Sequence, residues 1–392
     1  LSTAAQTIKP SGIRKFFDLA NQMEGVISLG VGEPDFATPW KIREAAIYSI
    51  EKGRTFYTAN RGLLELRQEI SNYYYRRFGV HYDPENEIIV TVGGSEGIDI
   101  AVRALMNPGD EMIILDPGYV AYEPSVILSG GVPVRIHLEE KDEFKLTPEK
   151  LKAAITPKTK LMLINFPSNP TGGAMTREDY EKLVPIIKES GLIVISDQIY
   201  AELSYEEPFS TLASFPEIRD QIVVINGFSK AYAMTGWRLG YVIANPQIID
   251  RVKKVHDFLT VGAAAPLMEA AVVGLEFGDG YYDELAAHYA HMKEVFVGGL
   301  KKLGLKYTDP QGAYYVLVDV SEFGVKDDVK FCEWMTQFVG VAAVPGSSFF
   351  REDVHNLVRF HFAKQDDTLN EAIKRLATLK EKAMNAKNVD WR

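Results

Sequence analysis

Short runs of consecutive apolar residues recur between residues 87 and 244, and segments with helical spacing separate them. Most runs are unbroken rather than alternating, which is typical of strands that are covered on both faces by helices. The runs lie at residues 87–91, 112–115, 132–136, 161–164, 192–195, 222–225 and 241–244. Among the intervening segments, Thr176 followed by Asp179 is typical of a helix start. The alternation predicts an α/β fold with a mainly parallel, seven-stranded sheet.

The pattern changes after a long helical region at about residues 266–303. Short β-type runs then appear at residues 314–320, 341–345 and 357–362, together with a helix near residues 328–339 and a charged helix from Asp366. This mixture predicts a smaller α+β domain. We expect residues 1–44 to form an N-terminal arm and part of the small domain, residues 45–285 a large domain, and residues 286–392 the small C-terminal domain.

Composition narrows the class of protein. The 392 residues are 46% hydrophobic and carry a net charge of −10 without a basic block, which argues against nucleic acid as a partner. Cys332 is the only cysteine, so no internal disulfide forms and a reducing compartment is expected. No apolar run reaches the roughly 20 residues of a membrane span, and the N-terminus lacks a signal-peptide core. We therefore expect a cytoplasmic protein without a membrane partner, and we predict no metal ligands.

Polar side chains follow three successive predicted strands. Asn169 comes after the strand that ends near residue 165, Asp197 and Tyr200 after the next strand, and Lys230 after the third. In an open parallel sheet, ligands bind outside the carboxyl ends of the strands. The sequence therefore predicts one site at this edge of the sheet.

Lys230 indicates which chemistry that site performs. Partial desolvation of a lysine at a strand end favours its neutral amine, which can attack an aldehyde and form a Schiff base. Ser229 and Arg238 supply a hydroxyl and a cation, the usual complement for a phosphate. An aldehyde that carries a phosphate is pyridoxal 5′-phosphate (PLP), and Asp197 facing its pyridine nitrogen would keep that nitrogen protonated. The alternatives are a surface lysine after a core strand and, for Asp197, a helix N-cap.

The glycine turn Gly93-Gly94-Ser95 follows the strand at residues 88–92 and opens a helix. Backbone N–H groups at a helix start, together with the helix dipole, form an anion site. A dinucleotide-binding fold is the rival interpretation. The turn lacks the G-x-G-x-x-G pattern, however, and no acidic residue is suitably placed on a second strand.

Taken together, these motifs resemble the pyridoxal-phosphate aminotransferases of fold type I, class I/II, over essentially the whole chain. The matching stretches are Gly32-Glu-Pro-Asp-Phe36, Tyr57, Gly62 with Leu66-Arg67, Asn169-Pro-Thr-Gly172, Ser196-Asp197 with Tyr200, Ser229-Lys230 with Met234-Thr-Gly-Trp-Arg238, Gly312-Ala-Tyr314, Val344-Pro-Gly-Ser347 and Arg359. Several independent motifs occur in the family's order, which makes the resemblance far more specific than any one motif.

The resemblance implies that the large domain binds PLP. Lys230 would form the internal aldimine and later move the proton between the substrate α-carbon and the cofactor. Asp197 would pair with the pyridine nitrogen, while Tyr200 and Asn169 would hydrogen-bond the phenolic oxygen. Tyr119 would stack on the cofactor ring, and Tyr57 would reach the phosphate of the neighbouring subunit. The phosphate would be held by four residues: Gly94, Ser95, Ser229 and Arg238.

The resemblance also implies how substrate binds. Arg359 would bind the α-carboxylate through two parallel hydrogen bonds, with Asn169 nearby. Gly32 would lie in a mobile N-terminal segment that closes over substrate. Ser95 stands where some acid-specific relatives carry lysine, so that position offers no cation for a distal carboxylate. With Tyr119 and Phe36 expected near the side-chain pocket, we favour aromatic donors.

The predicted protein is a homodimeric transaminase with shared active sites. It would move an amino group from an L-amino acid, aromatic or broad in range, to a 2-oxo acid such as 2-oxoglutarate. A PLP-dependent C–S β-lyase or a cyclising synthase on the same fold is the alternative, because both keep the lysine, aspartate and arginine. A regulator built on this fold would need an added DNA-binding module, for which the chain has neither spare length nor a basic helix.

Overall fold

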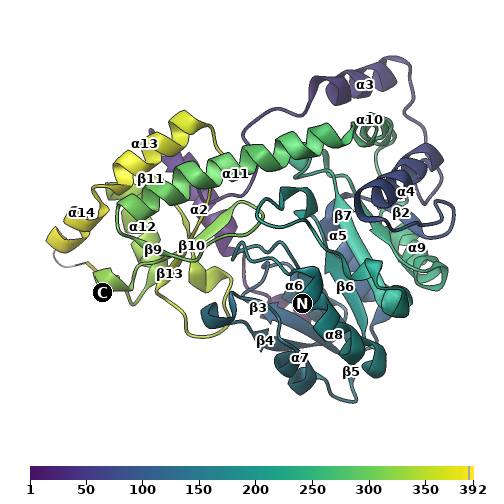
Figure 1. Ribbon diagram of the computed structural model, residues 1–392, viewed down its shortest axis with the longest axis horizontal. Coiled ribbons are helices and arrows are strands. Elements are labelled where there is room, and N and C mark those ends of the chain that lie inside the picture. The colour runs from purple at the N-terminus through teal and green to yellow at the C-terminus, as the bar shows by residue number, and fades with distance from the viewer. Residues whose placement is uncertain (387–388) are drawn as a thin grey trace.

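All seven apolar runs pair into one sheet in the computed structural model, which describes residues 1–386 and 389–392 (Figure 1). In spatial order the strands are β2 (Ile88–Thr91), β8 (Gly240–Ile243), β7 (Ile222–Gly227), β6 (Ile193–Asp197), β5 (Thr159–Asn165), β3 (Glu111–Asp116) and β4 (Val132–His137). Only β8 runs against its neighbours, β2 and β7. The mainly parallel α/β fold is therefore confirmed.

Apolar residues cover both faces of this sheet. In β5, Leu161 and Leu163 contact one buried cluster, while Met162 and Ile164 contact the other. Successive side chains of a strand point to opposite faces, so a strand with two buried faces has an unbroken apolar sequence. The first cluster includes residues of α5 (Gly93–Leu105) and α9 (Pro246–Thr260). The second extends into the smaller part of the molecule, which the N-terminal segment and the C-terminal part of the chain form together.

Further helices surround the sheet. They are α3 (Trp40–Glu51), α4 (Leu64–Phe78), α6 (Tyr122–Leu128), α7 (Pro148–Ala154), α8 (Arg177–Ser190) and α10 (Ala265–Leu275). Thr176 caps α8 as predicted, because its hydroxyl accepts from the Asp179 backbone N–H while the Asp179 carboxylate accepts from that of Thr176. Within residues 1–386 and 389–392, every helix is too short or too polar to cross a lipid bilayer.

The smaller part contains two further sheets. One is antiparallel, in the order β12 (Val344–Pro345), β13 (Leu357–His361), β10 (Tyr315–Asp319) and β9 (Lys306–Tyr307), and the other pairs β1 (Ile27–Ser28) with β11 (Val341–Ala342). Its helices are α2 (Gly12–Asn21), α12 (Asp328–Phe338), α13 (Asp366–Leu376) and α14 (Leu379–Asn385), whereas α1 (Thr3–Thr7) contacts α6 of the large part. Because β1 pairs with β11, the N-terminal segment joins the C-terminal part of the chain.

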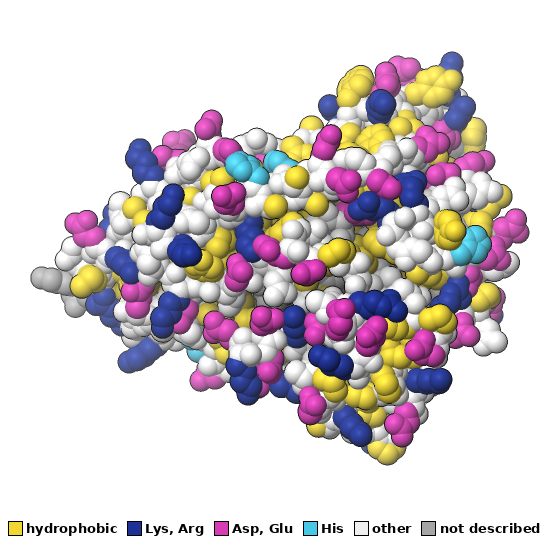
Figure 2. All heavy atoms as spheres, viewed as in Figure 1, with side chains coloured by type: hydrophobic (Ala, Val, Ile, Leu, Met, Phe, Trp, Pro, Cys, Tyr) yellow, Lys and Arg dark blue, Asp and Glu magenta, His cyan; other side chains and the backbone are white. Residues whose placement is uncertain are grey.

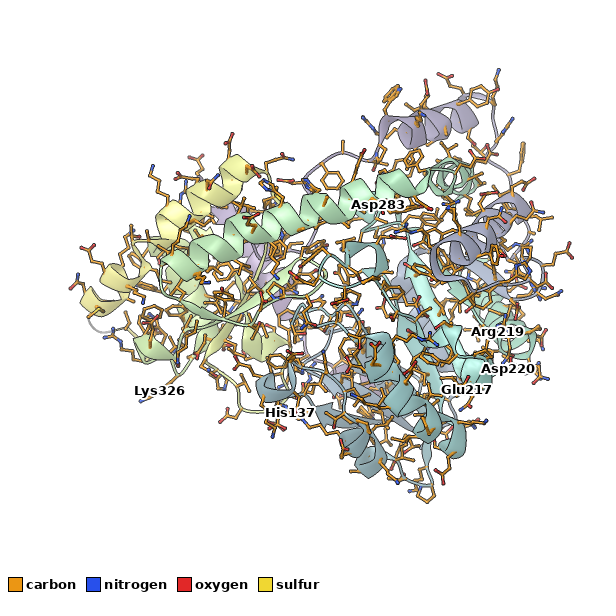
Figure 3. The ribbon with its side chains drawn as sticks, viewed as in Figure 1. His137, Glu217, Arg219, Asp220, Asp283 and Lys326 are labelled. Atoms are coloured by element: carbon orange, nitrogen blue, oxygen red, sulfur yellow. The ribbon has the colours of Figure 1, made fainter. Side chains whose placement is uncertain are left out.

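The long helix α11 (Asp279–Lys302) connects the two parts (Figure 1). Asp283, near its start, lies over the large sheet, whereas Lys326 lies toward the far end of the smaller part (Figure 3). The helical region predicted at residues 266–303 is thus two helices, α10 and α11, with a break at residues 276–278.

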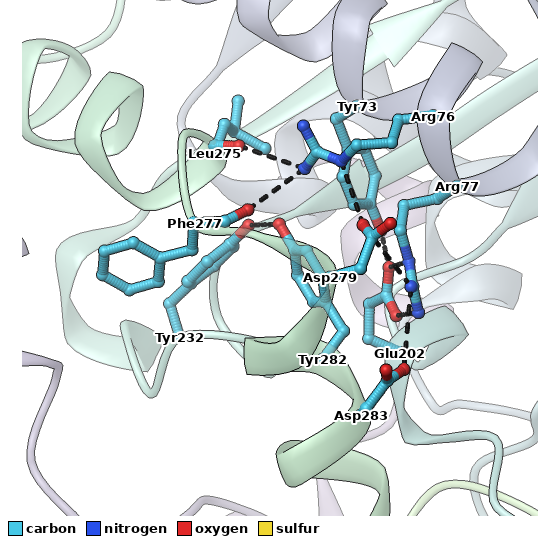
Figure 4. A network of polar contacts seen from close by, with 10 residues as sticks. All are labelled: Tyr73, Arg76, Arg77, Glu202, Tyr232, Leu275, Phe277, Asp279, Tyr282 and Asp283. Atoms are coloured by element: carbon cyan, nitrogen blue, oxygen red, sulfur yellow. Dashed lines mark hydrogen bonds and ion pairs between the residues drawn. The ribbon is translucent and has the colours of Figure 1, made fainter.

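A buried ion pair joins helix α4 to the turn that follows Tyr200, and a more exposed ion pair joins α4 to the start of α11 (Figure 4). Glu202 accepts hydrogen bonds from the Tyr73 hydroxyl (2.6 Å) and from Arg77 Nη2 (2.8 Å). Arg76 Nε donates to Asp279 at 3.0 Å. Removing one member of such a buried pair leaves an uncompensated charge, so the network holds the turn behind Tyr200 in one position.

Apolar side chains are exposed on α3 and the loop after it. Trp40, Tyr48 and Ile50 are each about half exposed, Phe56 is 83% exposed and Tyr57 is 91% exposed. Figure 2 shows apolar side chains gathered over α3, at the upper right. An apolar surface of this kind is typical of a protein–protein interface.

Candidate active site

A cavity of about 530 Å³ lies at the carboxyl ends of β5, β6 and β7, and the N-terminal segment and β13 complete its walls. It brings together all the site residues predicted from the sequence except Tyr57. They are Gly32, Gly94, Ser95, Tyr119, Asn169, Asp197, Tyr200, Ser229, Lys230, Arg238 and Arg359. Tyr57 lies outside the cavity, in the exposed loop after α3.

Lys230 reaches the cavity from the turn that follows β7. Its Nζ donates a hydrogen bond to the Gly32 carbonyl oxygen at 2.8 Å. Burial lowers the pKa of Lys230 to about 8; Glu33 opposes this shift, and the positive charges of Arg359 and Arg238 add to it. A substantial fraction of the amine is therefore neutral at mildly alkaline pH, as a nucleophile requires.

Asp197 is the last residue of β6, where the register places it beside Asn165 and Ile225. Its carboxylate accepts hydrogen bonds from the Tyr122 hydroxyl (2.8 Å) and the Ile199 backbone N–H (3.1 Å). Burial raises the pKa of Asp197 to about 6, although both hydrogen bonds oppose the shift. No described lysine, arginine or histidine forms an ion pair with it, so this buried carboxylate is suited to a cationic ligand atom.

The start of α5 forms a second polar wall. Gly93 has φ +76°, and a Cβ there would lie 2.6 Å from Arg238 Nη2, so the guanidinium closes against the first turn of the helix. Arg238 Nη1 also donates to the Thr235 carbonyl at 2.9 Å. A helix N-terminus, an adjacent guanidinium and the hydroxyl of the buried Ser229 together complement a phosphate.

Arg359 in β13 is 1% exposed and lies between two aromatic rings, 4.3 Å from the Tyr315 centroid and 4.5 Å from that of Phe349. Its Nη1 donates to Asn169 Oδ1 and its Nη2 to the Gly30 carbonyl, both at 2.6 Å. Arg359 Nε has no hydrogen-bond partner among the described residues. A buried guanidinium with a free donor is suited to a carboxylate.

The segment Asn169-Pro-Thr-Gly172 joins the large sheet to the smaller part. Asn169 N–H donates to Asn165 Oδ1 (3.0 Å), and the Gly172 carbonyl accepts from the backbone N–H groups of Gln311 (2.8 Å) and Gly312 (3.0 Å). Gly172 has φ +72°, and a Cβ there would lie 2.7 Å from the Tyr315 carbonyl oxygen. Only glycine allows this approach without strain.

The N-terminal wall depends on a second close approach. A Cβ on Gly32 would lie 1.9 Å from the Tyr315 hydroxyl, so this position has room only for glycine. The Tyr314 hydroxyl donates to the Gly32 carbonyl at 2.8 Å, and the hydroxyls of Tyr315 and Tyr200 lie 2.8 Å apart. A cluster of tyrosines therefore positions both Tyr200 and the carbonyl that binds Lys230.

The structure adds residues that the sequence patterns did not single out. Tyr122 hydrogen-bonds Asp197, Tyr315 contacts Tyr200 and Arg359, and Arg14 from α2 lines the cavity. The expectation for Phe36 is wrong, because its ring packs edge-on against His288 of α11, 5.6 Å between centroids, and does not line the cavity. In the sequence, Tyr122 and Tyr315 could have been found only from their positions, three residues after Tyr119 and in the consecutive tyrosines after Ala313.

The cavity fits a phosphorylated pyridine aldehyde. It offers an amine with a lowered pKa for the aldehyde, a buried carboxylate without an ion-pair partner among the described residues for the ring nitrogen, and a helix start with a guanidinium for the phosphate. The described residues contain no group of three or more His, Cys, Asp or Glu side chains arranged to hold a metal ion.

Comparisons with known proteins place these features in context. Residues 24–376 match the family model described as aminotransferase class I and II. The chain is 46% identical over 376 residues to YugH of Bacillus subtilis, covering 96% of this chain and 97% of that one. It is 34% identical over 388 residues to aromatic-amino-acid aminotransferase 2 of Thermococcus litoralis, covering 98% and 99%. The structure of N-succinyldiaminopimelate aminotransferase from Mycobacterium tuberculosis is similar, with a TM-score of 0.93, 32% identity, and coverage of 97% and 100%.

Proposed function

The chain belongs to the class I and II aminotransferases and is an enzyme, and from this premise we propose a specific reaction and cofactor. The enzyme transfers the amino group of an L-amino acid, aromatic or broad in range, to a 2-oxo acid such as 2-oxoglutarate. PLP is the cofactor and Lys230 is the residue to which it binds covalently. The observation that carries the proposal is the meeting of Lys230, Asp197 and Arg359 in one cavity.

When bound, PLP withdraws electrons from the bonds at the substrate α-carbon. The Asp197 carboxylate holds the proton on the pyridine nitrogen. The Lys230 amine, whose pKa is lowered to about 8, would take the proton from the substrate α-carbon and deliver it to the cofactor carbon that carries the aldehyde. Burial favours the neutral amine of Lys230, whereas the hydrogen bonds from Tyr122 and Ile199 favour the carboxylate of Asp197.

The remaining residues fix the positions of cofactor and substrate. Tyr200 and Asn169 donate hydrogen bonds to the phenolic oxygen, and Tyr119 stacks on the ring. Gly94, Ser95, Ser229 and Arg238 hold the phosphate. Arg359 binds the substrate α-carboxylate, with Asn169 beside it and the N-terminal segment around Gly32 excluding water.

The Thermococcus litoralis relative is named for aromatic amino acids, whereas a Pyrococcus horikoshii relative, 36% identical over 375 residues, is named for aspartate. The proposed preference for aromatic donors therefore rests on Tyr119 and Ser95 in the cavity. The other candidate is a PLP-dependent C–S β-lyase or a cyclising synthase. Each would use the same lysine, aspartate and arginine.

The test is a comparison of products. The purified enzyme loaded with PLP should form glutamate and phenylpyruvate from phenylalanine and 2-oxoglutarate. When 2-oxoglutarate is omitted, it should form no glutamate and at most one equivalent of phenylpyruvate per active site. Cystathionine supplied alone tests the alternative, because a lyase would release pyruvate and ammonia from it without any acceptor. An enzyme that releases pyruvate from cystathionine over many turnovers, and forms no glutamate from phenylalanine and 2-oxoglutarate, would be a lyase and not a transaminase.

We also propose that the enzyme is a homodimer whose subunits share their active sites. The exposed apolar side chains on α3 and in the loop that carries Tyr57 support this arrangement, since two copies could bury them against each other. Asn60 anchors the loop, because its Nδ2 donates to Asp257 Oδ1 (3.0 Å) and to the Val261 carbonyl (2.7 Å). Tyr57 is exposed on this loop, and we propose that it binds the phosphate of the partner subunit.

Tyr57→Phe is expected to weaken PLP binding by about tenfold, because one hydrogen bond to an anion is lost. The apoenzyme is titrated with PLP to measure the dissociation constant. Tyr48→Phe, on the exposed face of α3, is the matched control and should bind PLP normally. Mixed dimers of Lys230→Ala and Tyr57→Ala subunits should contain one intact site, and verified heterodimers without recovered activity would contradict the shared site.

The domain boundaries and the cytoplasmic location stay predictions. The proposed boundary between residues 285 and 286 falls within α11, which runs without interruption from Asp279 to Lys302.

A further inference from the structure

A second cavity, of about 320 Å³, borders the segment that carries Asn169. Phe166 and Pro167 line it before Asn169, and Ala174 and Met175 line it after that residue. No described residue lines both this cavity and the active-site cavity, so the two are separate. The volume lies within the range of about 300–1,000 Å³ that is usual for small-molecule sites.

The second cavity is enclosed between the large sheet and the smaller part. Tyr200 lines the active site, whereas Ser204, in the turn that follows it, lines the second cavity. From the smaller part, Asp309 and Gln311 line the second cavity. Gln311 also joins the two parts, because its Oε1 accepts a hydrogen bond from the Ala174 N–H at 3.3 Å. A ligand in this cavity would therefore contact both parts of the molecule.

Buried side chains form part of the wall. Phe166 and Met175 are buried, and Tyr180, in the first turn of α8, is 2% exposed. The Tyr180 hydroxyl forms no hydrogen bond with any described residue. Because nearly all buried polar groups in proteins have a partner, this hydroxyl is suited to bind a polar group of a ligand.

The basic side chain in the wall is already neutralised. Lys145 is the only lysine or arginine that the described part of the chain places there. Its Nζ pairs with the carboxylates of Glu143 at 2.9 Å and Asp179 at 3.3 Å. The described walls therefore offer no free cation to an anionic ligand.

The acidic side chains, by contrast, outnumber their partners. Glu206 and Asp309 line the second cavity, and both pair with Lys293 of α11, at 2.6 Å and 3.1 Å. Glu207 also lines the cavity, is exposed, and forms no ion pair with any described residue. Three carboxylates thus share one ammonium group, which leaves an excess of negative charge that attracts a cationic ligand.

We propose that the second cavity binds a small organic ammonium ion that carries an aromatic ring. The ring packs against the apolar side chains of Phe166 and Met175, and the ammonium group faces the carboxylate of Glu207. An ammonium group only donates hydrogen bonds, and both the Glu207 carboxylate and the Tyr180 hydroxyl can accept them. The faces of the aromatic rings in the wall also attract a cation. This site is distinct from that of the proposed transamination and does not depend on it.

Calorimetry with the PLP-loaded enzyme tests the proposal. The probes are N,N-dimethylbenzylamine, which is a cation at neutral pH, and N,N-dimethylbenzamide, which has a similar shape but no charge. A tertiary amine cannot form a Schiff base with PLP, so its binding does not report the active-site chemistry. The wild-type enzyme should bind the amine at least about fivefold more tightly than the amide, and Glu207→Gln should weaken amine binding by about threefold, the effect of one exposed ion pair. Glu217→Gln, which changes an exposed carboxylate outside the cavity (Figure 3), should bind both probes as the wild type does.

Two larger side chains locate the site. Ser210→Phe and Ala174→Leu each fill part of the second cavity from a different segment, and each should remove measurable binding of the amine. Thermal unfolding identifies a variant that has lost its fold, in which case the other variant decides. Equal affinity of the wild type for amine and amide would overturn the proposal, as would the absence of binding. Amine affinity retained in both filled variants would also overturn it, because the amine would then occupy another cavity.

Discussion

Lys230→Ala is expected to lower transamination by at least about 10⁴-fold while leaving a folded protein that still binds PLP. The lysine supplies both the covalent bond to the cofactor and the base that moves the substrate proton, and acid–base catalysis alone contributes about 10²–10⁴-fold. Folding should change little, because the hydrogen bond from Nζ to the Gly32 carbonyl contributes only about 1 kcal/mol.

Borohydride reduction and peptide mapping identify the lysine directly. The reduced cofactor should be found on Lys230 in the wild-type enzyme and be absent from Lys230→Ala, which should still bind PLP reversibly in equilibrium dialysis. Lys254→Ala is the control, since Lys254 pairs with Asp250 on the surface of α9 and should have no role. Stoichiometric cofactor on any other lysine would refute the assignment.

Asp197→Asn is expected to lower kcat by about 10²–10³-fold, the usual cost of removing one group that stabilises charge in the transition state. Asparagine is similar in size. Its Oδ1 can accept from the Ile199 backbone N–H and its Nδ2 can donate to the Tyr122 hydroxyl, so the fold should be retained. Asparagine carries no negative charge, however, and cannot hold the pyridine nitrogen protonated.

The measurement pairs steady-state rates with the visible spectrum of bound PLP. The cofactor should still bind to Asp197→Asn, while turnover falls for aromatic and acidic donors alike. Asp220→Asn, which changes an exposed carboxylate in the loop before β7, should behave as the wild type. Turnover near the wild-type rate in Asp197→Asn would show that another group protonates the ring.

The central sheet was predictable because burial on both faces leaves a local signal. Six strands of the large sheet are mostly buried apolar runs, and the seven predicted runs, with the more exposed β4 among them, correspond to β2 through β8. The pairing of β1 with β11 left no such signal, since each contains two residues and the partners are more than 300 residues apart. Such a pair is determined by tertiary packing rather than by propensity.

The floor of the site was predictable for a similar reason, because Asn169, Asp197 and Lys230 each follow a strand whose end is visible in the sequence. Arg14 and Tyr315 were not, because they reach the cavity from α2 and β10 through the folding of the N-terminal segment against the smaller part. The misplacement of Phe36 has the same origin. The ring of Phe36 packs against His288 of α11, because the N-terminal segment passes that helix, and the two residues are distant in sequence.

The carbonyl groups of Gly30 and Gly32 have a thermodynamic consequence for every ligand. They already accept hydrogen bonds from Arg359 and Lys230, the two cationic groups on which substrate and cofactor depend. An anion that binds Arg359 through Nη2 therefore exchanges one hydrogen bond for another and gains only the difference between them, whereas a contact with Nε displaces no bond to a described residue. The Lys230 amine must likewise leave the Gly32 carbonyl before it can react with an aldehyde. The two backbone carbonyls thus set the free-energy reference against which each ligand binds.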